Sequence, residues 1–537
     1  METNWKRHLK DLPDLLNDAV LQERGMNMNI TQAKEYIKDS VRIYLKKDEY
    51  GDYKVPIVRQ RPIFLLGAPG IGKTAIMEQV AQELGIALVS YSMTHHTRQS
   101  ALGLPFIRHR VYDGLEMDIS EYTMSEIIAS IYDVMEESGV KEGILFLDEI
   151  NCVSETLAPS MLQFLQYKTF GRHRVPEGWA IVTAGNPPEY NKSVREFDVV
   201  TYDRLRVLEV EEDYEAWKVY AQEKGIHNAV TNFLDLKKEY FYRIETTVKG
   251  RSYVTARGWE DLASVLTLYE EEGLLVDETL VGQYLRNDRI VKEFTAYYDL
   301  YQKYKKDYHV EEILAGEYQE DTVKKAAEAP FDERLSLLGM LLDRVQGEIR
   351  EVMETSAYLS DVIRPLKAVR GTLQKQQEEG KDTAKQVLSI LQAQEEGRSR
   401  LLESMQKANS LSDQEKRKAK AVLRFLREAQ KEIAGILPCS GADAFAVLKK
   451  KFDAQVAGMK AETGRVQEWL HQMFSFVDRA FAGGNEMLIL VTELTVNDSS
   501  ARFIATFGCP DYQKHNEELM LSERQGNIQK EIADLEL

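Results

Sequence analysis

The stretch RPIFLLGAPGIGKTAIME, residues 61–78, joins a short apolar run to a glycine-rich turn and then to a helical pattern. The run Ile63–Leu66 has the character of a buried strand, and the helical pattern begins at Ala75. Glycines let backbone N–H groups close around a polyphosphate where a Cβ would intrude, and a helix N-terminus adds positive potential. This context favours a phosphate-binding loop over an ordinary turn between a strand and a helix. The loop consists of Gly67, Ala68, Pro69, Gly70, Ile71, Gly72, Lys73 and Thr74.

The side chains that would act on a bound nucleotide lie in this loop and after a second apolar run. Lys73 would reach the β- and γ-phosphates, and the Thr74 hydroxyl would take a magnesium position. The run Ile144–Leu147 ends in Asp148 and Glu149, at the edge where a parallel sheet holds its ligands. Asp148 would act on magnesium through its water shell, and Glu149 would polarise the attacking water. An isolated Asp-Glu pair is more often a solvated strand end, but its place after the loop favours the catalytic interpretation.

Further patterns predict an α/β fold in which helices flank a parallel sheet. A polar residue at the tip of one predicted strand, Asn186, is placed to hold the lytic water against the γ-phosphate. The other strand candidates are Ile86–Tyr91, Trp179–Thr183 and a run within Asp198–Val210. Helices are predicted at Ser125–Met135 and Leu157–Leu165, and a hairpin at Thr169–Gly178. No metal role is predicted for the histidines His95, His96 and His109, because no carboxylate or cysteine completes a ligand spacing.

The composition describes a globular protein with much exposed helical surface, with 43% apolar and 29% charged residues among 537. This length predicts roughly three or four domains or subdomains. The net charge of −18 argues against wholesale binding to nucleic acid or to an anionic membrane, but it leaves a local basic patch open. Three distant cysteines, Cys152, Cys439 and Cys509, predict a reduced, cytoplasmic protein. No signal peptide and no membrane insertion are expected, since no run approaches the ~18 apolar residues of a membrane span.

Four regions are predicted along the chain. Residues 1–60 are helices and a linker, 61–210 the α/β nucleotide-binding domain, 211–308 a helical region, and 309–537 a long, mainly helical C-terminal region. In the first region, apolar side chains repeat at helical spacing in two groups, Leu15, Leu16, Ala19 and Val20, and then Ala33, Ile37, Val41 and Tyr44.

The C-terminal region carries helical patterns and no catalytic set, so we assign it by elimination to partner or substrate engagement. Residues Leu366–Leu437 are predicted as long antiparallel helices, in a coiled-coil arm or in a compact helical domain. Ser412 opens a capping box, Pro365 is expected to break the preceding helix, and Pro438 to end the following one. Met487–Val496 is either a strand or a buried helix, and residues 513–537 form a terminal helix. The apolar faces are Leu338, Leu341, Val345, Ile349 and Val352, and then Val422, Phe425, Leu426, Ala429 and Ile433.

These motifs, in this order, resemble the AAA+ ATPases, and more closely the MoxR-type group that works with von Willebrand factor A domain proteins. The resemblance covers about residues 60–290. Gly67–Thr74 match the Walker A motif, Ile144–Glu149 the Walker B motif, and Asn186 the sensor 1 position.

Three arginines complete the resemblance. Arg204 in YDRLR matches the arginine finger that family members insert into a neighbour's site, and Arg206 is the other candidate for that role. Arg257 in TARGWEDL resembles the sensor 2 arginine of the helical lid. Any one of these five matches could arise by chance, but a chance match of all five in the same order is negligible.

The resemblance implies an AAA+ α/β core with an α-helical lid at residues 211–308, and ATP with Mg²⁺ as cofactors. It implies self-assembly into a ring, a hexamer in the family, and chaperone-like remodelling or maturation of a partner, a von Willebrand factor A domain protein. Gly103–Phe106 falls where the group carries an insert, and Thr169–Trp179 resembles the hairpin before sensor 1. Both elements face the ring pore in the family. The chain differs from the pattern of this group at two places. It has Gln99–Ala101 before the insert, where an acidic residue is usual, and it lacks the usual proline before Arg257.

Two other functions stay open on this reasoning. A nucleic-acid motor is one, because related inserts and hairpins move DNA and Arg172, His173 and Arg174 could follow phosphates. The net charge and the lack of an aromatic and basic binding module weigh against it. A nucleotide-switched scaffold is the other, in which the C-terminal helices bind a partner and hydrolysis only resets them.

Overall fold

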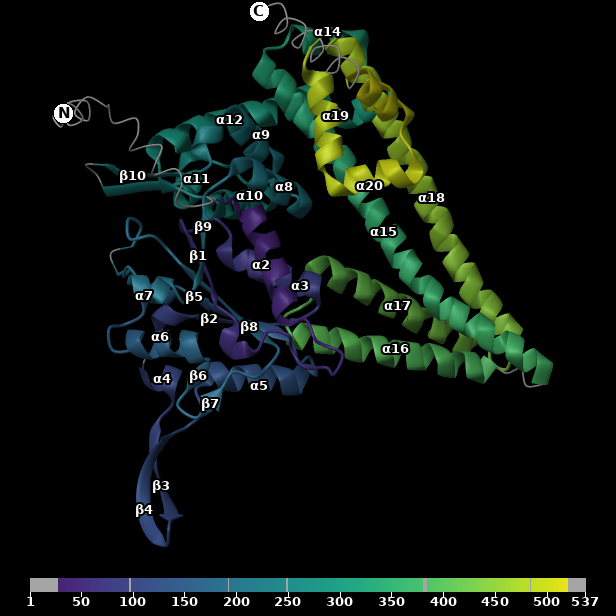
Figure 1. Ribbon diagram of the computed structural model, residues 1–537. Helices are drawn as coiled ribbons and strands as arrows, with labels where there is room; N and C mark the ends of the chain where they lie inside the picture. Colours follow the sequence, from purple (N-terminus) through teal and green to yellow (C-terminus); the bar gives the residue numbers. More distant parts are fainter. Residues whose placement is uncertain are drawn as a thin grey trace, which may run out of the picture. The chain divides into compact units, whose positions relative to one another are not determined.

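The computed structural model describes residues 28–95, 98–191, 193–247, 250–379, 384–482 and 484–519 (Figure 1). The chain divides into two compact units. The first runs to Ala216 and also includes Glu403–Leu411, and the second comprises Trp217–Leu402 and the chain from Ser412 onward. The helix predicted around Leu15 and most of the predicted terminal helix lie outside the described residues.

A five-stranded parallel sheet forms the centre of the first unit. Its strands read as nearly continuous apolar runs because both faces of the sheet are covered. Leu66 pairs with Gly185, and Leu147 with Thr183, so the carboxyl ends of three strands meet at one edge. The sheet confirms the predicted α/β architecture. The strand order is β2 (Ala87–Ser92), β5 (Gly143–Asp148), β8 (Trp179–Gly185), β1 (Ile63–Gly67) and β9 (Arg206–Val210).

Helices cover the sheet, and the predicted helices of this region are confirmed. The predicted stripe of α2, from Ala33 to Tyr44, is buried, and Asn29 caps this helix with a capping box to Gln32. The covering helices are α2 (Ile30–Tyr44), α3 (Lys73–Leu84), α4 (Arg98–Leu102), α5 (Glu126–Ser138), α6 (Ala158–Tyr167) and α7 (Val199–Tyr202).

Two hairpins extend from this unit. The predicted one is confirmed as β6 (Thr169–Phe170) and β7 (His173–Arg174). The other, β3 (Pro105–Tyr112) with β4 (Leu115–Tyr122), is a ribbon that projects away from the sheet and was not predicted (Figure 1). Both of its faces are exposed, so it lacks an alternation of apolar and polar residues. The turn Asp113-Gly114, with φ of 53° and 82°, is the hairpin signal that the sequence offered.

A distant turn covers the free edge of β2. The backbone N–H of Leu88 donates to the Ala408 carbonyl at 2.9 Å, and the Asn409 amide donates to the Leu88 carbonyl at 3.4 Å. Ala408 is fully buried in the core of this unit. The edge strand therefore has partners for backbone groups that would otherwise be open to pairing with another chain.

The second unit begins with the helical region predicted before residue 308. A two-stranded hairpin, β10 (Arg243–Thr247) with β11 (Gly250–Val254), interrupts it, so the prediction of helices alone was wrong there. An aromatic cluster holds the helices together, with Phe233 about equally close to Trp259 (5.8 Å) and Phe294 (5.2 Å) between ring centroids. The helices are α8 (Tyr214–Lys224), α9 (Asn228–Leu236), α10 (Ala256–Glu271), α11 (Glu278–Tyr284) and α12 (Asp288–Tyr308).

Long helices make up the rest of this unit, and α15 and α18 pack along one another (Figure 1). The capping box at Ser412 and the end of α17 before Pro438 are confirmed. Met487–Val496 is helical, which settles that alternative. The helices are α13 (Val310–Ala315), α14 (Glu320–Glu328), α15 (Phe331–Glu379), α16 (Ala384–Lys407), α17 (Asp413–Gly435), α18 (Gly441–Ala480), α19 (Glu486–Val496), α20 (Asp498–Phe507) and a last helix at 510–519.

Pro365 does not break α15, contrary to the prediction. A proline inside a helix leaves the carbonyl four residues earlier without its N–H partner. Here that carbonyl belongs to Asp361, and the Arg398 guanidinium donates to it at 3.1 Å. The side chain of a neighbouring helix thus replaces the missing hydrogen bond, and the helix continues to Glu379.

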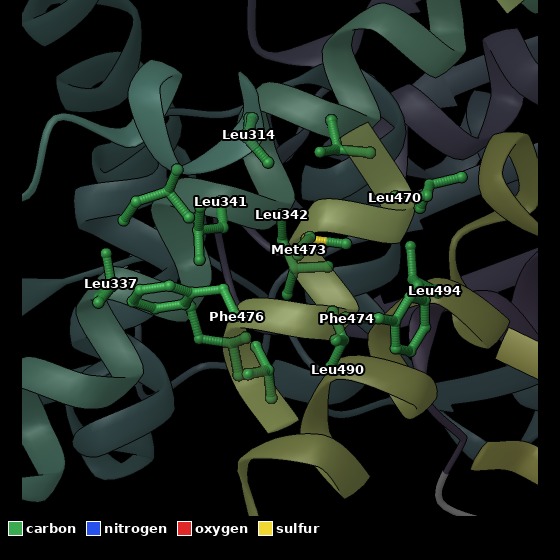
Figure 2. Packing of buried hydrophobic residues seen from close by; sticks show 14 of the residues in the cluster. Leu314, Leu337, Leu341, Leu342, Leu470, Met473, Phe474, Phe476, Leu490 and Leu494 are labelled. Atoms are coloured by element: carbon green, nitrogen blue, oxygen red, sulfur yellow. The ribbon is translucent and has the colours of Figure 1, made fainter. Parts of the chain in front are cut away.

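Two apolar clusters hold the long helices. One joins α15, α18 and α19, and its members include Leu341, Met473 and Leu490 (Figure 2). The other joins the end of α15 to α16, α17 and the start of α18, and it buries the predicted face of α17. None of the helices in the described ranges is long and apolar enough to cross a membrane.

Candidate functional site

The glycine turn after β1 is shaped for close backbone packing. A Cβ on Gly67 would lie 2.5 Å from the Val210 carbonyl of the neighbouring strand β9, so only glycine fits there. Gly72 precedes α3 with φ of 96°, in the left-handed region that favours glycine. Gly72 offers no side-chain cap, and the first turn of α3 has no acidic residue. Its backbone N–H groups and its dipole are therefore suited to an anion.

Lys73 is only 8% exposed and lies between the loop and the edge of the sheet. Its ammonium donates to the Gly67 and Ala68 carbonyls, both at 2.8 Å, and to the Asn186 side-chain oxygen at 2.9 Å. The structure thus brings together a lysine and an asparagine that are 113 positions apart in the sequence.

Two oxygen ligands meet beside the lysine. The Thr74 hydroxyl donates to a carboxylate oxygen of Asp148 at 3.0 Å. Hydroxyl and carboxylate oxygens are the ligands that Mg²⁺ prefers, and it needs only a few from the protein when phosphates supply others. The pair therefore fits a nucleotide-bound magnesium ion. Among the described residues, no group of three histidine, cysteine or acidic side chains forms another metal site.

Glu149 follows Asp148 and has a left-handed backbone conformation, which a residue other than glycine adopts only when its surroundings hold it there. Its φ of 55° and ψ of 36° are left-handed, and its N–H donates to an Asp148 carboxylate oxygen at 2.8 Å. One oxygen of its own carboxylate accepts from the hydroxyls of Ser92 and Thr94, each at 3.0 Å. These contacts fix the direction of the carboxylate at the edge of the sheet.

Ser92 and Thr94 were missed from the sequence. Ser92 is the last residue of β2 and Thr94 follows it, and that strand lies next to β5, whose end carries Asp148. Strand ends of neighbouring parallel strands share an edge, so the position of Ser92 was a usable signal once the strand order was known. The strand order itself was not predicted.

Asn186 is held by a residue that the sequence also left unnoticed. The Asn151 amide donates to the Asn186 carbonyl at 2.8 Å, and Asn151 is 4% exposed. A Cβ on Gly185 would lie 2.4 Å from the Asn151 side chain, so the tip of β8 packs directly on it. Asn151 stands two positions after Glu149, which is the one hint the sequence gave.

We expect Ser92→Ala with Thr94→Val to lower kcat for ATP about tenfold while leaving ATP affinity unchanged, because the hydroxyls orient Glu149 without touching the phosphate loop. Steady-state hydrolysis and a nucleotide titration measure the two quantities. Ser90→Ala is the matched control, since Ser90 is exposed on the same strand. An unchanged kcat in the double variant would show that Glu149 keeps its direction without them.

The two candidate arginines for contact with a neighbour differ sharply. The side chain of Arg204 is exposed and makes no hydrogen bond or ion pair within the part of the chain that the structure describes. Arg206 donates to the hydroxyls of Tyr36 and Tyr44 on α2, and its guanidinium lies 4.9 Å from the centre of the Tyr36 ring. Arg206 is thus engaged within its own chain, and this favours Arg204 for an outward role.

Arg206→Ala should lower the Tm by roughly 2–4 °C, because it removes hydrogen bonds worth about 1 kcal/mol between β9 and α2. Arg204→Ala should leave the Tm unchanged, since an exposed side chain without hydrogen bonds or ion pairs contributes little to stability. Thermal unfolding of both variants under the same conditions makes the comparison. Equal losses would mean that Arg204 also has a partner within its own chain.

Arg257 belongs to the second unit. It is exposed near the start of α10, where Thr255 caps the helix by accepting from the Gly258 N–H. Its role toward a nucleotide stays a prediction. Of the three histidines considered for metal binding, His96 lies outside the described residues, and His109 pairs with Asp118 across the ribbon.

The part of the chain that contains this edge of the sheet matches a known family. Residues 63–195 match the family model described as "ATPase family associated with various cellular activities (AAA)". These residues are therefore similar to an AAA ATPase domain, and we call them the AAA domain. The AAA domain covers the phosphate loop, the Asp148-Glu149 pair and Asn186, while Arg204 and Arg257 lie beyond the matched residues.

Comparisons of the whole chain add less. No curated protein sequence matches it. Among solved structures, the crystal structure of NtrX from Brucella abortus is similar, with 16% identity and a TM-score of 0.22. The match covers 41% of this chain and 44% of NtrX, so the chain spans less than half of that protein. A likeness at this level supports no inference about function.

Proposed function

We propose that the AAA domain hydrolyses ATP with Mg²⁺, and that Lys73, Thr74, Asp148, Glu149 and Asn186 perform the reaction. The observation that carries the proposal is the meeting of these five side chains at the carboxyl ends of β1, β5 and β8. Lysine, magnesium ligands, a carboxylate and an amide at one edge are the set that phosphoryl transfer to water requires.

The chain's own residues divide the work. The loop N–H groups and Lys73 bind the phosphates, and Thr74 and Asp148 would hold magnesium, which would neutralise phosphate charge when bound. Glu149 accepts a proton from the attacking water, and Asn186 orients that water. The contact between Lys73 and Asn186 links the phosphate-binding side of the site to its water-binding side.

We further propose that the protein works as a ring, a hexamer by its resemblance to MoxR-type proteins, in which Arg204 enters the neighbour's site. Two observations support an intersubunit role for this face. The Arg204 side chain is exposed and makes no hydrogen bond or ion pair among the described residues, and α7, just before it, exposes Val199 (83%) and Val200 (56%). Exposed apolar side chains beside an unpaired arginine suit burial against a second copy.

The substrate we propose is a protein, specifically a von Willebrand factor A domain protein, which the ring remodels or matures in the cytoplasm. The exposed ribbon supports a protein substrate, because extended apolar surface of this kind suits contact with polypeptide. A nucleic-acid motor has less support, since Arg172 is already paired with Glu121. The apolar side chains that the ribbon exposes are Phe106, Ile107, Val111, Tyr112, Leu115, Met117 and Tyr122.

The test has two stages. Purified protein should release phosphate from ATP only with Mg²⁺, and double-stranded or single-stranded DNA should not stimulate it. The variant Glu149→Gln, loaded with ATP, should then retain a purified von Willebrand factor A domain partner that ADP releases. DNA-stimulated hydrolysis that falls steeply with salt would instead support the motor. Capture of the partner without any change in its conformation or activity would support a nucleotide-switched scaffold.

A further inference from the structure

Three arginines converge on one carboxylate at the base of the ribbon, where it extends from the rest of the AAA domain. Glu121, near the end of β4, is 8% exposed although the ribbon around it is open to solvent. Its oxygens lie 3.3 Å from the guanidinium nitrogens of both Arg108 and Arg110 on β3, and closer still to that of Arg172. Arg172 comes from the other hairpin, β6–β7, 51 positions later in the chain. One carboxylate therefore balances three guanidinium charges from two hairpins.

The charge balance at this point depends on the Glu121 carboxylate. Burial alone would raise its pKa, but the hydrogen bond from Arg108 and the charges of Arg172 and Arg110 outweigh that effect and lower the pKa. Without the carboxylate, three like charges would face one another and repel. The junction would then open instead of merely losing one contact.

Two more contacts occur at the same place. His173 has its Nε2 3.4 Å from the Tyr122 carbonyl, and a Cβ on Gly171 would lie 4.0 Å from the Tyr122 Cβ. Two successive residues of the β6–β7 hairpin, Arg172 and His173, thus contact the last two residues of β4. The two hairpins therefore meet through two neighbouring side chains and not through one alone.

The β6–β7 hairpin is in turn packed against α6 and continues into β8, the strand that ends at the candidate nucleotide site. Phe170 is 2% exposed and stacks on Phe164 of α6, with ring centroids 4.1 Å apart. Val175 is fully buried, and its N–H donates to the Lys168 carbonyl at the end of α6. The same hairpin leads directly into β8, whose tip carries Asn186. A displacement of α6 or β8 therefore moves the hairpin with it.

We propose that Glu121 and Arg172 form a coupling contact through which the nucleotide state of the site sets the position of the β3–β4 ribbon. This rests on the proposed ATP binding at Lys73. The ribbon residues 105–120 are exposed apart from partial cover at 110 and 119, so this junction is where the domain can act on them. Arg172 and Glu121 are positioning residues, because neither touches the nucleotide site.

The variant that tests the coupling is Arg172→Gln, which removes the ion pair between the hairpins and leaves both the two arginines of the ribbon on Glu121 and the contact of His173 with Tyr122. Arg174→Gln is the matched control, because Arg174 is exposed on the same hairpin and has no ion pair among the described residues. Arg172→Lys keeps one charge at the junction and should rescue the coupling in part. All three are made in the full chain that also carries Glu149→Gln, so that ATP stays bound.

Hydrogen exchange with and without Mg-ATP gives the readout, followed in residues 67–74, 169–175 and 105–122. In the parent and in Arg174→Gln, ATP should change exchange severalfold in all three segments. In Arg172→Gln, the first two segments should respond as before, and the ribbon should lose its response. A ribbon that responds equally in Arg172→Gln overturns the coupling, as does a parent in which the loop responds and the ribbon does not. No response at residues 67–74 would instead overturn the proposed ATP site.

Discussion

Glu149→Gln should bind ATP as tightly as the wild type and hydrolyse it about 10²-fold to 10⁴-fold more slowly, the range expected for loss of a general base. The amide keeps the size of the side chain and can still meet the Ser92 and Thr94 hydroxyls. It cannot accept the proton of the attacking water. Binding, which rests on the loop and on Lys73, should therefore be separated from chemistry. Calorimetric titration with ATP and single-turnover hydrolysis measure the two properties.

Lys73→Ala should have the opposite effect, because it should remove ATP binding itself. The ammonium is the charged group that the site offers to the phosphates, and it is 8% exposed among loop carbonyls. Its loss should abolish measurable binding of ATP, not only turnover. Arg206→Ala serves as a control for general damage, because Arg206 supports the same sheet through α2 without facing the phosphate loop. Wild-type ATP affinity in Lys73→Ala would remove Lys73 from the phosphate site.

Much of the AAA domain could be read from the sequence because its strands are buried on both faces. Runs such as Ile63–Leu66 and Ile144–Leu147 contain no polar residue, which indicates a strand buried on both faces. In a parallel sheet the residues that follow such strands lie at one edge, and these include Lys73, Asp148 and Asn186. This rule places the five candidate residues at one edge of the sheet without any knowledge of the strand order, and the order β5, β8, β1 makes them neighbours. The roles assigned to them remain proposals until the variants are measured.

What the sequence could not provide depends on contacts between distant segments. The hydroxyls on Glu149 come from β2, and only the strand order reveals that β2 is next to β5. The continuation of α15 through Pro365 depends on Arg398, on another helix. Both faces of the ribbon are exposed, so its sequence lacks the alternation of apolar and polar residues that indicates a strand. The ion pair of Glu121 with Arg172 joins two hairpins that are distant in the sequence, so no local spacing could predict it.

Arg204→Ala should lower kcat about 10³-fold or more if Arg204 acts as an arginine finger, while ATP binding by each subunit is kept. The side chain is exposed and unpaired among the described residues, whereas Arg206 is held by two tyrosines of its own chain. A finger supplied by a neighbour also makes hydrolysis depend on assembly. The specific activity of the wild type should therefore rise with protein concentration until the ring is full.

Mixing two inactive variants decides whether Arg204 acts within its own subunit or in the next one. In an equal mixture of Arg204→Ala and Lys73→Ala, half of the subunits keep Lys73, and half of those have a neighbour with Arg204, so about one quarter of all sites are complete. Activity should return to a corresponding fraction of the wild-type value. A finger acting in its own chain predicts no recovery, because every site would lack one group. If native mass spectrometry shows mixed rings and activity stays absent, Arg204 is not the group supplied in trans, and Arg206 becomes the next residue to test despite its contacts with α2.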